Sequence, residues 1–159
     1  MDISLAVVEV IQAMLAPGLM ISACGLLLLS MNNKYSLVVN RIRLLGEERR
    51  RFSIKASERE FLYQEEVRLK SISIQLDKLK YRVKMVRNAV FSYSLAVALF
   101  VITSMQIGAS FILKSSNFET LVIVSFSIGM FLVLVGICFA AIETIKGYEI
   151  ISYETKADE

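Results

Sequence analysis

The fold is decided by residues 89–142, which run AVFSYSLAVALFVITSMQIGASFILKSSNFETLVIVSFSIGMFLVLVGICFAAI. The formally charged residues in this stretch are Lys114 and Glu119. They bound a short polar turn between two apolar runs, residues 89–113 and 121–142. Each run is long enough to cross a bilayer as a helix, which takes about 20 residues. Because lipid offers no partners to free backbone groups, we expect two antiparallel transmembrane helices, the second and third spans of the chain.

A third apolar run lies upstream, at residues 5–31, and is interrupted by Glu9, Gln12 and Pro17. Its length predicts a further transmembrane helix, the first span. Pro17 can bend a helix, so the sequence leaves open whether residues 2–15 cross the membrane or lie along its surface.

Hydrophobic residues make up 55% of the chain and charged residues 21%, but the two kinds are kept apart. Of the 18 Lys and Arg residues, 15 lie between Lys34 and Arg87 with seven acids, a local net charge of +8. The rest of the chain has three bases and eight acids, or −5, so the total of +3 hides this separation. Globular domains mix charged and apolar residues, and disordered chains contain far fewer apolar ones. The separation therefore predicts an integral membrane protein.

The basic segment also predicts the orientation of the protein in the membrane, because loops rich in Lys and Arg stay in the cytoplasm. We expect the N-terminus and the turn after the second span outside, and the basic segment and the C-terminus inside. Bases at the inner surface attract anionic lipid headgroups, which are an expected partner. Nucleic acid is not expected, since seven acids interleave with the bases and the spans already account for the charge bias.

Apolar residues within the basic segment recur at alternating spacings of three and four, the heptad pattern of a coiled-coil seam. The later stripe, a predicted oligomerisation seam, comprises Leu62, Leu69, Ile72, Leu76, Leu79, Val83 and Val86. An earlier stripe comprises Tyr35, Val38, Ile42, Leu45 and Phe52. Ser57 with Glu60 forms a capping-box pattern, so a break is expected between Arg51 and Ser57. The two stripes predict a long antiparallel, coiled-coil-like hairpin in the cytoplasm.

The expected fold class is therefore all-α, with three transmembrane helices and a cytoplasmic helical hairpin between the first and second spans. The N-terminal segment and first span occupy residues 1–33, and the hairpin occupies residues 34–87. The second and third spans occupy residues 88–145, and a cytoplasmic tail follows at 146–159.

A second apolar edge on the hairpin indicates contacts between subunits. Phe61, Ile74 and Tyr81 lie off the main seam. A two-helix hairpin buries little apolar surface alone, so we expect the chain to form a homo-oligomer. The alternative is that both stripes serve only the packing of one hairpin within one chain.

The chain offers little material for an enzyme. It contains no His, and its two Cys residues, Cys24 and Cys138, fall inside predicted spans. A Ser-His or Cys-His pair and a metal cluster therefore lack their residues, and we expect no enzyme activity, metal or cofactor. Adjacent carboxylates such as Glu47 and Glu48 are ordinary features of a solvated helix face.

Ionisable groups deep in a membrane usually mark a transport function. Glu9, Glu119 and Glu143 all lie near the ends of the predicted spans, so none is expected at mid-membrane. This pattern argues against a proton-coupled transporter.

Small and weakly polar residues gather near one face of the first span: Gly18, Ser22, Gly25, Asn32 and Asn33. Close helix packing explains such spacings, as it does for Ser125 with Gly129 in the third span. The functional alternative is that this face lines a water-filled path in an oligomer. Asn32 and Asn33 would then ring its cytoplasmic mouth and offer amide groups to a small inorganic ion.

The stretch from Pro17 to Arg43, PGLMISACGLLLLSMNNKYSLVVNRIR, resembles a known family. The matching features are Pro17, the run of Leu at 26–29, the Asn32-Asn33 pair and the VNRIR segment at 39–43. The family groups small bacterial and archaeal membrane proteins with three predicted spans under a domain of unknown function. The resemblance covers most of the chain and implies a multi-pass protein of the prokaryotic inner membrane. It implies no activity or ligand.

Two functions follow from the sequence. The first is a homo-oligomeric ion-conducting channel with a polar first-span face. The alternative is a membrane-anchored scaffold or regulatory subunit that recruits a partner through its cytoplasmic hairpin. The two differ in the membrane region, which would enclose a wet pathway in the first case and be packed solid in the second.

Overall fold

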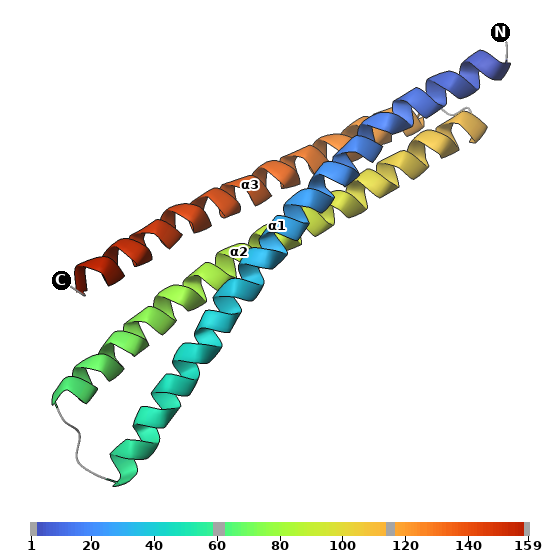
Figure 1. Cartoon of the computed structure of the whole chain (residues 1–159). Helices are drawn as coiled ribbons and strands as arrows, with labels where there is room; N and C mark the ends of the chain where they lie inside the picture. Colours follow the sequence, from blue (N-terminus) through green and yellow to red (C-terminus); the bar gives the residue numbers. More distant parts are fainter. Residues whose placement is uncertain (1–2, 59–62, 114–116, 158–159) are drawn as a thin grey trace. The chain divides into compact units, whose positions relative to one another are not determined.

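The computed structural model describes residues 3–58, 63–113 and 117–157, and these residues form three α-helices (Figure 1). Helix α1 covers Ile3–Glu58, α2 covers Tyr63–Leu113 and α3 covers Asn117–Ala157. The prediction of an all-α chain is confirmed. Each of these helices contains a stretch long and apolar enough to cross a membrane.

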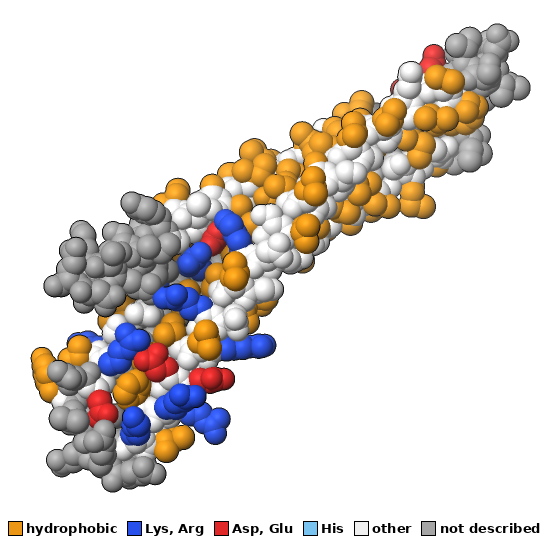
Figure 2. All heavy atoms as spheres, in the orientation of Figure 1, with side chains coloured by type: hydrophobic (Ala, Val, Ile, Leu, Met, Phe, Trp, Pro, Cys, Tyr) orange, Lys and Arg blue, Asp and Glu red, His pale blue; other side chains and the backbone are white. Residues whose placement is uncertain are grey.

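The chain divides into two compact units. The first unit combines Met1–Met31 with Asn88–Cys138, and the second combines Asn32–Arg87 with Phe139–Glu159. Figure 2 shows hydrophobic side chains over the first unit and many Lys and Arg side chains on the second. The first unit thus contains most of the apolar sequence, and the second contains the basic segment.

The first unit packs α2 against α3 through aromatic rings set on glycines. Tyr93 and Phe100 of α2 are buried, and both rings lie where a side chain on α3 would otherwise stand. A Cβ added at Gly136 would lie 2.5 Å from the Tyr93 ring, and one at Gly129 would lie 2.8 Å from the Phe100 ring. The ring of Phe126 adds a tilted contact with Phe100, at 5.5 Å between centroids. Glycine therefore permits the close approach of these two helices.

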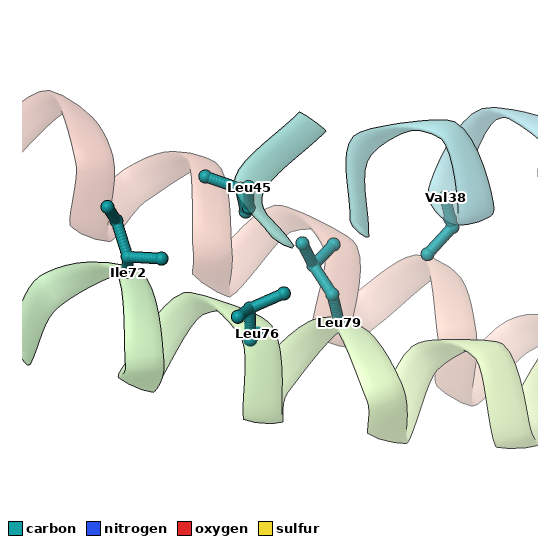
Figure 3. Packing of buried hydrophobic residues seen from close by; sticks show 5 residues of the cluster. All are labelled: Val38, Leu45, Ile72, Leu76 and Leu79. Carbon is teal, nitrogen blue, oxygen red and sulfur yellow. The ribbon is translucent and has the colours of Figure 1, made fainter. Parts of the chain in front are cut away.

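The second unit packs α1 against α2 through an aliphatic cluster. Its buried members are Val38, Leu45, Ile72, Leu76 and Leu79, whose side chains are shown in Figure 3. Ile42, Phe52 and Val83 pack around them. Burial of each such side chain stabilises the folded state by about 1.5–3 kcal/mol. Both predicted stripes thus meet inside one chain.

The break between α1 and α2 differs from the prediction. Helix α1 continues through Ser57 to Glu58, so Ser57 does not begin the second helix. Gly46 lies inside α1, where its cost of about 1 kcal/mol in a helix is offset by the packing of Leu45 and Phe52 in the aliphatic cluster. Residues 59–62, which include the predicted Phe61 and Leu62, lie outside the described residues.

Pro17 also lies within α1, which is helical from Ile3 onward. Proline is tolerated within membrane helices because neighbouring groups satisfy the carbonyl that it leaves free. Its side chain is buried in the first unit. The sequence left open how residues 2–15 lie in the membrane, and the described residues 3–15 are part of this same helix.

Candidate functional site

The small residues of the first span form an open face on α1. Gly18, Ser22 and Gly25 are all exposed in the first unit. A Cβ added at Gly18 or Gly25 would meet no atom within 4 Å. The Ser22 hydroxyl donates to the carbonyl of Gly18 at 3.3 Å, one turn earlier on the same helix. Among the described residues, no other helix therefore stands against Gly18 or Gly25, and Ser22 lies exposed between them.

A second side of α1, about 100° around the helix from Gly18 and Gly25, makes the contacts within the first unit. Pro17, Cys24 and Met31 are buried, and they follow one another at intervals of seven residues. This spacing keeps one stripe of a helix facing its neighbours. The open face is thus distinct from the surface by which α1 joins its own unit.

Asn32 and Asn33 lie at the start of the second unit, and both side chains are exposed on α1. An amide offers a carbonyl oxygen and an N–H₂ group to a ligand. The structure thus leaves all five predicted residues of the first-span face accessible, the glycine and serine positions in one unit and the asparagines in the other.

The predicted seam residues of α2 lie largely inside the protomer. Ile72, Leu76, Leu79 and Val86 are buried, and Leu69 and Val83 are half-buried. Three of them belong to the aliphatic cluster shared with α1. Their role in contacts between subunits stays a prediction. Leu62 lies outside the described residues.

A hydrogen-bonded polar group joins α2 to α3 in the first unit. The Ser125 hydroxyl donates to Oε1 of Gln106 at 2.7 Å and lies 3.0 Å from the Thr103 hydroxyl. Thr103 and Ser125 are both buried. In a membrane such bonds hold helices together, because the alternative is an unpaired polar group in hydrocarbon. This group therefore has a structural role between the two helices.

An ion-pair cluster joins all three helices in the second unit. The Glu143 carboxylate of α3 is only 1% exposed and accepts bonds from Lys34 of α1 at 2.9 Å and Arg82 of α2 at 2.6 Å. Lys34 also donates to the Thr144 hydroxyl at 3.1 Å. Gly147 leaves room for the guanidinium, since a Cβ there would stand 3.0 Å from Nη2 of Arg82. A buried charge must be paired in this way to be tolerated.

The sequence did not reveal either polar group. The spacing of small residues pointed to Ser125 with Gly129, but not to the partners Thr103 and Gln106 on α2. For Glu143 a signal was present, because a carboxylate directly after an apolar span needs a cation nearby. With 15 bases in the charged segment, the sequence could not show which two would meet it.

Large apolar side chains cover the surface of the first unit and indicate the class of protein. Leu26, Phe91, Met105 and Phe131 are each more than 60% exposed, and all lie within the apolar stretches. Such exposure of large side chains is costly in water and normal in a bilayer. The three apolar helices indicate a multi-pass membrane protein.

A family model described as a protein of unknown function (DUF2721) matches residues 14–152, and the chain belongs to this family. No curated protein matches the chain, and neither does any solved structure. The resemblance drawn from the stretch after Pro17 is thereby confirmed at the level of the family.

Proposed function

We propose that the chain forms a homo-oligomer in the membrane and that the open face of α1 lines an ion-conducting path at its centre. A protomer of three helices is too small to enclose a pathway. The proposal therefore requires a closed symmetric ring, the usual form of a homo-oligomer.

The observation that carries the proposal is the open space at Gly18 and Gly25. Small residues in a membrane helix normally permit close approach of another helix. Gly129 and Gly136 of α3 serve that purpose within the protomer, while Gly18 and Gly25 of α1 have no neighbour among the described residues. A second copy, or a water-filled path bordered by copies, fits the free face.

The exposed polar groups favour the path over simple packing. Ser22, Asn32 and Asn33 all face away from the protomer, and polar groups at a constriction are how pores select ions. We place the asparagines at the cytoplasmic mouth. The permeant species would be a small inorganic ion.

Unpartnered apolar residues on the second unit support assembly. Val67, Ile74 and Tyr81 of α2 are exposed at intervals of seven residues, as are Leu37 and Leu44 of α1. A heptad spacing outside the main seam is typical of a helix that packs against a further helix. This stripe suits contacts between hairpins of neighbouring subunits.

Localisation in a prokaryotic inner membrane is part of the proposal. The concentration of bases in the second unit favours a cytoplasmic hairpin, with the N-terminus outside and the C-terminus inside.

Ion flux into liposomes tests the proposed channel. Purified protein should dissipate a potassium or chloride gradient across the liposome membrane. Gly25→Leu should reduce this ion flux at least tenfold, because the larger side chain would fill the path. Asn33→Leu should alter the ratio of potassium to chloride. Ala98→Leu is the matched control, since Ala98 is also small and exposed but lies on α2. Absence of flux at every voltage and pH, from protein shown to be folded, would contradict the channel.

The exposed stripe on the second unit also favours a second candidate function, a scaffold that recruits a partner helix. Crosslinking in cells from Val67 or Ile74 distinguishes the two. Capture of one other protein, with a membrane region that carries no ions, would favour the scaffold. Capture of further copies of the same chain would favour the oligomer.

A further inference from the structure

Among the side chains that the structure describes, the ion-pair cluster of the second unit is not balanced in charge. Two cations, Lys34 and Arg82, contact a single carboxylate, that of Glu143. The three side chains thus leave one positive charge in excess. An uncompensated charge near a low-dielectric region is costly, so the cluster favours an additional anion.

Donor groups remain for such an anion. The two bonds from Arg82 to Glu143 engage Nε and Nη2, which is two of the five N–H groups of a guanidinium. Lys34 is 39% exposed at its side chain and Arg82 is 21% exposed, whereas Glu143 is closed off. An incoming anion therefore reaches the two exposed cations more readily than the Glu143 carboxylate.

A cleft gives access to these cations. It has a volume of about 330 Å³ and is lined by Lys34, Leu37, Val38, Arg82, Glu143, Thr144 and Gly147. Its wall combines the charged cluster with the side chain of Leu37, which is 72% exposed. A cleft with a cationic base and an exposed apolar edge suits an amphipathic ligand.

The position of the cleft along the chain indicates the ligand's source. Lys34 follows the first apolar run by three residues and Glu143 follows the third by one. At 1.5 Å per residue this puts both within about 5 Å of the ends of the apolar runs, the depth of lipid headgroups. Phosphate groups are the anions present at that depth.

From these observations we propose that the cleft at Lys34 and Arg82 binds the phosphate of an anionic membrane lipid. A phosphodiester with one negative charge balances the excess charge of the cluster. Arginine presents paired N–H groups that match phosphate oxygens, and Lys34 adds a point charge. The site does not depend on ion conduction, because it lies outside the open face of α1.

Lipid retention in native mass spectrometry tests this site. Protein in detergent is titrated with dioleoylphosphatidylglycerol, which is anionic, or with dioleoylphosphatidylcholine, which is zwitterionic. The anionic lipid should be retained at lower concentration. Lys34→Gln should weaken its apparent affinity about fivefold, the effect of one cation near an anionic surface. Lys34→Arg should restore the affinity.

Lys80→Gln is the matched control, because it also removes one base of the second unit, but from a residue of α2 that is paired with Asp77 at the surface. Equal loss of lipid in the two Gln variants would overturn the site and leave only a general charge effect. A second arm adds inorganic phosphate to lipid-depleted protein and follows thermal unfolding. Stabilisation by phosphate that depends on Lys34 and matches that of the lipid would overturn the assignment to a lipid.

Discussion

The glycines of α3 and those of α1 have opposite surroundings in the same unit. Gly129 and Gly136 each face an aromatic ring of α2 that leaves no room for a methyl group. Gly18 and Gly25 face open space. The sequence spacings are alike, because the two glycines of each pair are seven residues apart on an apolar helix.

The difference shows that small residues in a membrane helix can have two roles, and that their spacing in the sequence does not tell which role applies. On α3 they admit a neighbour from the same chain. On α1 they form a surface that none of the described residues covers. Substitutions that enlarge each glycine by the same amount should therefore have opposite effects on the two helices.

Gly136→Ala should give the largest loss of stability. The new Cβ would lie 2.5 Å from a Tyr93 ring that is 1% exposed and so has little freedom to move. Overpacking of this kind costs about 1–3 kcal/mol, and we expect the upper part of that range. Unfolding in mixed micelles with increasing SDS measures the change. Unaltered stability would show that the ring is not held against α3.

Gly129→Ala should destabilise the protein less, by about 1–2 kcal/mol. Its Cβ would stand 2.8 Å from the Phe100 ring, a smaller overlap than at Gly136. The companion change Phe100→Leu in the same chain should recover part of the loss by making room. A double variant less stable than the sum of the two single variants would contradict this packing.

Thr103→Val tests the polar contact beside these rings. It keeps the shape of the side chain but removes the hydroxyl that lies 3.0 Å from that of Ser125. We expect a loss of about 0.6–1.7 kcal/mol, the range for bonds between membrane helices. Ser104→Val, at a neighbouring position of α2, is the control and should change the SDS midpoint less.

Gly18→Ala should have the smallest effect on the stability of the protomer, and the change should be neutral or stabilising. The Cβ meets nothing within 4 Å, and alanine favours a helix over glycine by up to about 1 kcal/mol. The SDS midpoint of dissociated protomers should stay unchanged or rise. A fall comparable to that of Gly136→Ala would mean that α1 is covered within the protomer.

The fold could be predicted far into its details from the sequence. Apolar runs of sufficient length fixed the three helices, since backbone groups in lipid leave few alternatives. The heptad spacing of Ile72, Leu76 and Leu79 located the surface that meets α1, because this spacing keeps apolar side chains on the side of a helix that faces a neighbouring helix. The start of α2 was placed too early, because capping residues such as Ser57 also occur inside helices.

The open face of α1 and the ion-pair cluster were harder to predict from the sequence. Spacing identified Gly18 and Gly25 as small positions, but it could not show that the three described helices leave them uncovered. The partners of Glu143 were hidden for a similar reason. Lys34 and Arg82 are two bases among many, and only the packing of three helices brings them to one carboxylate.

Cysteine crosslinking in native membranes tests the central claim most directly, that the open face of α1 meets other copies of the chain. Ser22→Cys is placed in a chain whose own cysteines carry Cys24→Ala and Cys138→Ala, and Ala98→Cys in that chain is the control. A disulfide requires Cα atoms within about 7 Å. The account predicts covalent dimers from Ser22→Cys, formed in much higher yield than from Ala98→Cys. Monomers alone, or equal yields at the two positions, would contradict it.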